Sequence, residues 1–220
     1  MNPVTAFANF FTGGGPFMYV ILAVGLLCLA LIAERFWTIG RAARLNAGKF
    51  GDDLLRCVSN NDRPRALDLC RQVPGPVSAV ALGILGRGAT DEQTLQAAAD
   101  AEASIALPPL SRRLPFLGML ANSATLLGLL GTIFGLTTAF SAVGAADPSQ
   151  RSAFLAAGIS QALNTTAFGL IIAVPAMLAH GFLVSRVDAV VEQVDQVSVR
   201  LIKALCRRQT GTPGAQQKAA

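Results

Sequence analysis

The chain has 220 residues, of which 52% are hydrophobic and only 14% are charged, and its formal net charge is +5. No Asp, Glu, Lys or Arg occurs in residues 1–33, 114–146 or 152–185. A helix needs only about 20 apolar residues to cross the hydrocarbon of a bilayer. The pattern therefore excludes an ordinary soluble core and predicts an all-α membrane protein with three transmembrane helices.

The first predicted span covers residues 16–33 and follows an uncharged segment, residues 1–15. That segment lacks the positively charged start of a signal peptide, so we expect the first span to be retained. Residues 34–113 contain eleven Lys or Arg and residues 186–220 contain six, whereas only Arg151 lies between the second and third spans. Because cytoplasmic flanks collect Lys and Arg, the N-terminus is expected outside and the C-terminus in the cytoplasm.

Residues 34–113 are predicted to form a cytoplasmic helical domain. Apolar residues recur at helical spacing over residues 42–72, interrupted by an Asn-Asn-Asp turn and a proline. A Pro-Gly-Pro sequence ends this pair, and Ala-rich helix is expected over residues 77–106. Within it, the run DEQTLQAAADAEASIA begins with acids in its first turn, as the helix dipole favours. The basic residues here are mixed with acids and have no interleaved aromatic side chains, so we expect contact with lipid headgroups and no nucleic-acid binding.

The second span is expected over residues 114–143 and the third over residues 154–185, joined by a short outer loop, residues 144–153. From residue 186 onward, Val and Leu recur every three or four positions, which predicts an amphipathic cytoplasmic helix continuing the third span. Residues 211–220 are expected to be disordered. The chain is therefore predicted to have an outer N-terminal segment, three spans, a short outer loop and two cytoplasmic segments, residues 34–113 and 186–220.

Small residues and hydroxyls line one side of the second and third spans. The second span carries Thr125, Gly128, Thr132, Gly135 and Ala139 at intervals of three or four. The third span carries Gly158, Ala162, Thr166, Gly169, Ala173 and Ala176. Two interpretations fit: a close helix-packing seam whose threonines bond to their own helix carbonyls, or a narrow polar passage with Thr132 and Thr166 at one depth.

Three sequence runs carry a family resemblance: ANSATLLGLLGTIFGLTTAF at residues 121–140, ISQALNTTAFGLIIAVPA at residues 159–176, and ERFW at residues 34–37. Together they resemble the ExbB/TolQ/MotA family of ion-driven stator subunits, and most closely its ExbB/TolQ branch. The resemblance implies a homopentamer in the bacterial inner membrane, with the second and third spans lining a central pore. It also implies an ExbD/TolR-type partner with one span and a membrane-embedded aspartate.

The same resemblance implies what the complex does. Protons driven by the proton-motive force would visit the partner's carboxylate, and the changing charge would drive mechanical work on the cell envelope. TonB-like transport, Tol-Pal-like envelope maintenance and gliding motility are the loads that such complexes serve. No feature of residues 34–113 chooses among them.

The resemblance also assigns candidate residues. Thr132 and Thr166 match the family's pore threonines, and Gln161, Asn164 and Thr165 complete the expected proton pathway. The residues expected to pack the helices and line the pore are Gly128, Gly131, Gly135, Gly158, Ala162, Gly169, Ala173 and Pro175.

Gln161 departs from the family pattern, which has a glutamate there. An amide keeps hydrogen bonding but does not titrate. Three interpretations remain open: the partner supplies every proton-carrying carboxylate or the outer entry is tuned differently, the position serves packing, or the form is inactive.

Other chemistry has little support in this sequence. The four cysteines and the single His180 show no zinc-ligand spacing, and no Ser/His/Asp or paired-carboxylate constellation appears. We therefore expect no enzymatic activity, no cofactor and no metal, and we interpret His180 as an interfacial anchor rather than a proton relay. The alternative to a channel subunit is a non-conducting membrane scaffold that anchors the cytoplasmic helical domain.

Overall fold

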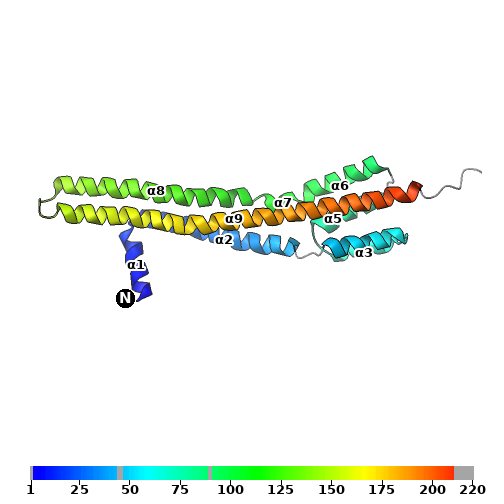
Figure 1. The fold of residues 1–220 in the computed structure, drawn as a ribbon, viewed down its shortest axis with the longest axis horizontal. Helices are drawn as coiled ribbons and strands as arrows, with labels where there is room; N and C mark the ends of the chain where they lie inside the picture. Colours follow the sequence, from blue (N-terminus) through cyan, green and yellow to red (C-terminus); the bar gives the residue numbers. More distant parts are fainter. Residues whose placement is uncertain (1, 44–46, 89–90, 211–220) are drawn as a thin grey trace, which may run out of the picture. The chain divides into compact units, whose positions relative to one another are not determined.

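The computed structural model describes residues 2–43, 47–88 and 91–210, and these residues form helices and turns without a strand (Figure 1). They divide into two compact units. The first unit contains the residues up to Glu34 together with Arg113–Phe182, and the second contains Arg35–Arg112 and the residues from Leu183 onward. The predicted tail at residues 211–220 lies outside the described residues.

Three of the described helices are long and apolar enough to cross a membrane. They are α2 (Phe17–Ala43), α8 (Leu114–Ala145) and α9 (Arg151–Thr210). This result confirms the predicted all-α membrane fold. The helix α9 continues without a break past residue 185, because neither Gly nor Pro interrupts the periodic Val and Leu residues of its second half.

The N-terminal segment contains a helix that the sequence did not indicate. The helix α1 (Pro3–Gly13) has a proline in its first turn, where a missing backbone N–H costs nothing. It ends at three consecutive glycines, of which Gly15 has a left-handed φ of 71°. We did not predict α1, because the segment is short and its polar residues are uncharged Asn and Thr.

The second unit contains the short helices α3 (Ala47–Ser59), α4 (Arg63–Gln72), α5 (Pro76–Gly86), α6 (Glu92–Ala106) and α7 (Pro108–Ser111). The expected Asn-Asn-Asp turn separates α3 from α4, with Asn61 at a left-handed φ of 62°. Asp62 then caps α4 by accepting a hydrogen bond from the backbone N–H of Arg65 at 3.1 Å.

The Ala-rich helical segment expected over residues 77–106 is divided into α5 and α6. The break was not predicted, whereas the acidic helix start at residues 91–92 is confirmed. α5 ends at Gly86, and Gly88 adopts a left-handed φ of 62°. Asp91 then starts α6 by accepting a hydrogen bond from the backbone N–H of Thr94 at 3.1 Å. Arg63 stabilises the end of α5, since its Nη2 donates to the carbonyl of Leu85 at 2.6 Å.

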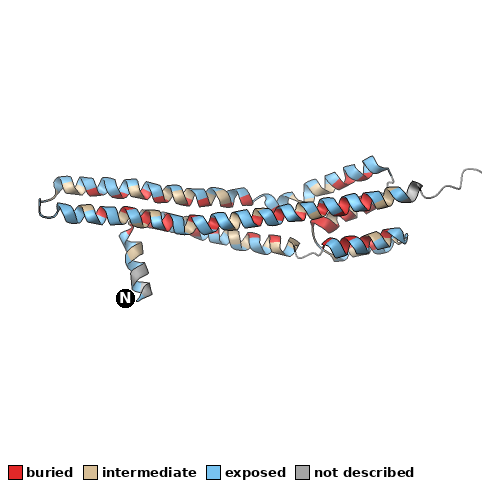
Figure 2. Ribbon diagram, viewed as in Figure 1, coloured by how far each residue is buried: buried red, intermediate tan, exposed pale blue. Residues whose placement is uncertain are grey.

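The second unit has a core of branched apolar side chains. Buried residues recur every three or four positions along its helices (Figure 2). Leu54, Leu95 and Leu201 are fully buried, and they join α3, α6 and the second half of α9. This arrangement is the packing expected of a helical domain in water.

Candidate functional site

From residue 121 onward, the side of α8 that is buried within the first unit consists of alanine and glycine. Its buried positions along the apolar segment are Ala121, Ala124, Gly128, Gly131, Gly135 and Ala139. These positions repeat every three or four residues, so they form one continuous stripe on the helix. Thr125 and Thr132 are half-buried and lie at the edge of this stripe.

The facing stripe on α9 is equally small. It contains Gly158, Ala162, Thr165, Gly169, Ala173 and Ala176, all of them buried. A Cβ on Gly169 would lie 2.7 Å from the carbonyl oxygen of Ala124, and a Cβ on Gly158 would overlap the Cβ of Ala139. The two backbones therefore approach so closely that glycine is required at these crossings. We call this contact the α8–α9 seam (Figure 1).

The register of the seam sets the depth of the threonines. A Cβ on Gly131 would lie 2.7 Å from the Cβ of Thr165, and one on Gly128 would lie 3.3 Å from the Cα of Thr166. Because the helices are antiparallel, Thr132 and Thr166 lie within about one helical turn of each other in depth. The hydroxyl of Thr166 crosses the seam and donates to the carbonyl of Gly128 at 3.1 Å.

The other two candidate threonines bond within their own helices. Thr132 donates to the carbonyl of Leu129 at 2.6 Å. Thr165 donates to the carbonyls of Gln161 at 3.2 Å and Ala162 at 2.8 Å. Each hydroxyl oxygen keeps its acceptor lone pairs, so each threonine retains the capacity to accept a hydrogen bond from an incoming acid.

The structure separates Gln161 and Asn164 from the α8–α9 seam. A Cβ on Gly15 would overlap the Nε2 of Gln161, and one on Gly13 would lie 3.2 Å from the Nδ2 of Asn164. Both amides therefore face the turn between α1 and α2. No sequence pattern predicted this contact, because the partners are about 150 positions apart and no helix was predicted for residues 1–15.

Pro175 lies within α9 and is exposed in the isolated chain. Since proline has no N–H, the carbonyl of Ile171 has no hydrogen-bond donor at the usual position four residues later. Neighbouring Ala173 is buried, and it belongs to the seam. Pro175 therefore introduces a local interruption of the α9 hydrogen-bond ladder just beyond the threonines.

Polar side chains meet near the predicted inner boundary of the spans. In the first unit, Glu34 forms an ion pair with Arg113, and the ring of His180 packs against Gly118. In the second unit, Arg35 is buried and its Nη1 donates to the carbonyl of Pro109 at 3.0 Å. The sequence did not predict these pairings, although it placed His180 at the membrane interface.

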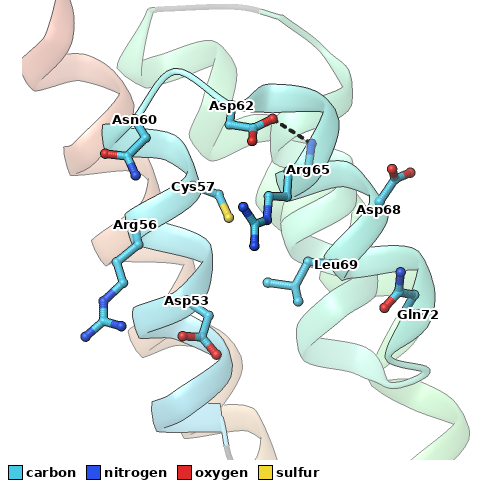
Figure 3. A pocket seen from close by; sticks show the side chains of 9 residues that line it. All are labelled: Asp53, Arg56, Cys57, Asn60, Asp62, Arg65, Asp68, Leu69 and Gln72. Atoms are coloured by element: carbon cyan, nitrogen blue, oxygen red, sulfur yellow. Dashed lines mark hydrogen bonds between the residues drawn. The ribbon is translucent and has the colours of Figure 1, made fainter.

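A surface hollow lies between α3 and α4 in the second unit (Figure 3). Its lining residues are Asp53, Arg56, Cys57, Asn60, Asp62, Arg65, Asp68, Leu69 and Gln72. Charges of both signs surround this open hollow, so nothing in it selects one kind of ligand. Among the residues that the structure describes, no group of three His, Cys, Asp or Glu is placed to hold a metal ion.

Comparison with known proteins places this geometry in context. The family model of the MotA/TolQ/ExbB proton channel family matches residues 74–196, which include α8 and all the seam residues of α9. An ExbB homologue of Methanothermobacter thermautotrophicus, described as a biopolymer transport protein, is 25% identical over 202 residues, covering 90% of this chain and 71% of that protein. An ExbB-like protein of Synechocystis is 31% identical over 172 residues, covering 75% of this chain and 79% of that protein.

A further relative shares a shorter segment. The Tol-Pal system protein TolQ of Haemophilus influenzae is 40% identical over 81 residues, which cover 37% of this chain and 35% of that protein. These names, the helical fold and the match over more than half of the residues agree with the resemblance found in the sequence. The chain belongs to the MotA/TolQ/ExbB proton channel family, in its ExbB/TolQ branch.

Proposed function

We propose that this membrane protein is an inner-membrane proton-channel stator subunit that converts proton-motive force into mechanical work on the cell envelope. The observation that carries the proposal is the α8–α9 seam. It brings Thr132 and Thr166 to one depth within segments that contain no charged residue. The family match covers this region, and a family of proton channels is a transport class rather than an enzyme class.

The threonine hydroxyls suit a carboxyl group that alternates between two protonation states. An ionised carboxylate in hydrocarbon is costly unless donors surround it. A hydroxyl that rotates its proton away from its carbonyl partner donates to a carboxylate, and the same oxygen accepts from a protonated acid. Thr132 and Thr166 are both half-buried in the isolated chain, so neither hydroxyl is sealed away from such an exchange.

The carboxyl group must come from another chain, since the three spans contain neither Asp nor Glu. We propose an ExbD/TolR-type single-span subunit with a membrane aspartate as its source. Large apolar side chains remain exposed on α8 and α9, among them Leu126, Ile133, Phe140, Leu163 and Leu178. Lipid and neighbouring copies in a homopentamer would cover these side chains, with α8 and α9 around a central pore.

The topology of the proposed subunit follows from charge. The N-terminus and residues 144–153 lie in the periplasm. The two basic segments, residues 34–113 and 186–220, lie in the cytoplasm. The relatives are named for biopolymer transport and for the Tol-Pal system. We therefore propose TonB-like transport or Tol-Pal-like envelope maintenance as the work performed, with gliding motility as a further possible load.

A non-conducting scaffold is the competing function, and one observation favours it. The hydroxyls of Thr132, Thr165 and Thr166 all donate to backbone carbonyls, as threonines in a purely structural seam do. A scaffold would need these threonines only for helix packing. The two functions therefore differ in what a hydroxyl contributes once the complex has assembled.

Proton flux into vesicles that contain the subunit with its single-span partner tests the proposal. The variant Thr132→Val removes the hydroxyl at nearly constant volume. Thr137→Val is the matched control, because Thr137 is exposed on the same helix and donates to its own helix carbonyl of Ile133 at 2.8 Å. We expect Thr132→Val to lose at least about tenfold in flux while the complex stays assembled, equivalent to about 1.4 kcal/mol. Equal flux in the native, Thr132→Val and Thr137→Val complexes would favour the scaffold.

A further inference from the structure

The turn between α1 and α2 consists of three consecutive glycines, and each has a reason to lack a side chain. Gly15 has a left-handed φ of 71°, which other residues adopt at a cost. A Cβ on Gly14 would overlap the Cγ of Met18, which is itself fully buried. A Cβ on Gly13 or Gly15 would meet the amides of Asn164 and Gln161. The turn is therefore closely packed against α9.

Aromatic and aliphatic side chains extend this contact along one side of α9. Phe10 and Phe11 pack edge-on against Phe168, with ring centroids 6.3 and 5.8 Å apart. Farther along the helix, a Cβ on Gly25 would lie 2.7 Å from the Cδ1 of Ile172. This side of α9 is distinct from the seam that faces α8. It attaches α1 and the start of α2 to α9.

The surroundings of Gln161 contain no charged side chain. Residues 2–33, 114–146 and 152–179 include all the segments of the first unit that pack on this part of α9, and none contains Asp, Glu, Lys, Arg or His. Tyr19 and Cys28 are the titratable side chains in these ranges. An amide fits such a place, whereas an ionised carboxylate would lose its water without gaining a cation.

We infer that Gln161 is a positioning residue that, together with Asn164, seats the Gly13–Gly15 turn and thereby fixes α1 and α2 about one helical turn from Thr165 and Thr166. It acts through the glycine turn and does not carry protons. The expected effect on proton flux rests on the proposed channel function. The geometry of the inference stands on the contacts of Gly13, Gly15 and Gln161 alone. Among the three interpretations of Gln161, the inference favours the packing position. The packing then serves to hold α1 and α2 against α9.

The first part of the test measures how firmly the Gly13–Gly15 turn and α1 are held against Gln161 and Asn164. Amide hydrogen exchange of residues 3–13 is followed in the complete complex in lipid nanodiscs. Gly15→Ala places a side chain at a left-handed position and against Gln161, so we expect about tenfold faster exchange in α1. Gly144→Ala is the matched control, because a Cβ on Gly144 meets nothing within 4 Å. Unchanged exchange in Gly15→Ala would overturn the inference.

The second part separates positioning from proton carriage by measuring flux on the same samples. We expect flux and α1 protection to fall together in Gly15→Ala, although its Gln161 is intact. In Gln161→Glu, ionisation as the pH rises should loosen α1 and lower flux over the same pH range. A carrier at this position would instead raise flux with pH while α1 protection stayed constant, and that result would overturn the inference.

A further comparison keeps the two proposals distinguishable. Gln161→Ala removes the side chain that lies against Gly15, and we expect parallel losses of protection and flux. Loss of flux with full α1 protection would identify a proton-pathway residue and overturn the positioning role. If the native complex conducts no protons while α1 exchange still responds to the change at Gln161, the channel function fails and the positioning role of Gln161 is upheld.

Discussion

The two units of this chain are both helical, yet they hold their helices together by different means. The second unit buries Leu, Ile and Val in a shared core, with Leu54, Leu95 and Leu201 fully buried. The first unit joins α8 to α9 through Gly, Ala and Thr, with backbone atoms close enough to exclude a Cβ at Gly169. The solvent accounts for the difference. Lipid is as apolar as leucine, so close backbone approach replaces hydrophobic burial in a membrane.

The largest expected effect is in the core of the second unit. Leu54→Ala should lower the free energy of unfolding of this unit by about 2–5 kcal/mol, because it removes a fully buried side chain and leaves a cavity. Ile105→Ala is the control, since Ile105 is 71% exposed on α6 and its truncation should change stability by less than about 0.5 kcal/mol. Hydrogen exchange of α3 and α6 measures both. Similar losses in the two variants would remove the contrast between core and surface.

In the first unit, adding a single methyl group should be harmful. Gly169→Ala places a Cβ 2.7 Å from a backbone oxygen, so we expect a loss of about 1–3 kcal/mol. Gly181→Ala on the same helix meets nothing within 4 Å and should be neutral or stabilising. Resistance to unfolding in detergent compares the two variants. Equal resistance would show that the α8 and α9 backbones leave room for a Cβ at residue 169, contrary to the structure.

The second unit should also show a pH dependence from Cys70. Burial, with a smaller contribution from Cys57, raises the pKa of the Cys70 thiol from 9.0 to about 11. The folded state therefore keeps this proton longer than the unfolded state, so the stabilisation is present below pH 9 and is lost as the pH rises toward 11. At pH 10 the loss is about 1.4 kcal/mol. The difference in unfolding free energy between the native chain and Cys70→Ala, followed from pH 8 to 11, measures it. A difference that stays constant over this pH range would contradict the raised pKa of the Cys70 thiol.

Helix capping should contribute about 1 kcal/mol in the second unit. Asp91→Ala removes the side chain that accepts from the backbone N–H of Thr94, and the first turn of α6 should fray. Asp91→Asn retains the acceptor and should restore most of the stability. Exchange of the amides in the first turn of α6 reports the change. If alanine and asparagine behave alike at this position, the cap does not stabilise the helix.

The smallest of these effects is expected from one hydrogen bond in the seam. Thr166→Val loses the bond to the carbonyl of Gly128 and should cost about 0.6 kcal/mol, the usual size for hydrogen bonds between membrane helices. Resistance to unfolding in detergent measures it against Thr137→Val. A much larger cost would mean that the hydroxyl holds the seam together.

The sequence predicted the parts of the fold that depend on long patterns. Three stretches without charge gave the apolar helices, and the glycine spacing placed Gly128 and Gly169 on the facing sides of α8 and α9. Adjacent residues were harder to distinguish, since they differ by only about 100° around a helix. The prediction therefore put Thr166 in the buried stripe, whereas the structure buries Thr165 there and bonds Thr166 across the seam.

Contacts between distant segments were beyond the reach of sequence patterns. The contact of Gln161 with Gly15 joins two residues without any shared periodicity, and α1 is a short segment whose polar residues are uncharged. The end of α5 depends on a left-handed Gly88, which the Ala-rich composition conceals, whereas the acids at residues 91–92 did indicate the start of α6. The proton-pathway roles of Thr132, Thr165 and Thr166 remain predictions.

The most direct test of the channel function is proton flux through the complete complex with Thr166→Ser and Thr166→Val. Serine keeps the hydroxyl and valine keeps the shape, so the pair separates chemistry from packing. The proposed function predicts that the serine complex conducts within about threefold of native, and that the valine complex loses at least about tenfold in flux with its subunits still assembled. Native flux in an assembled Thr166→Val complex would contradict the proposed role of the seam as the wall of a proton path.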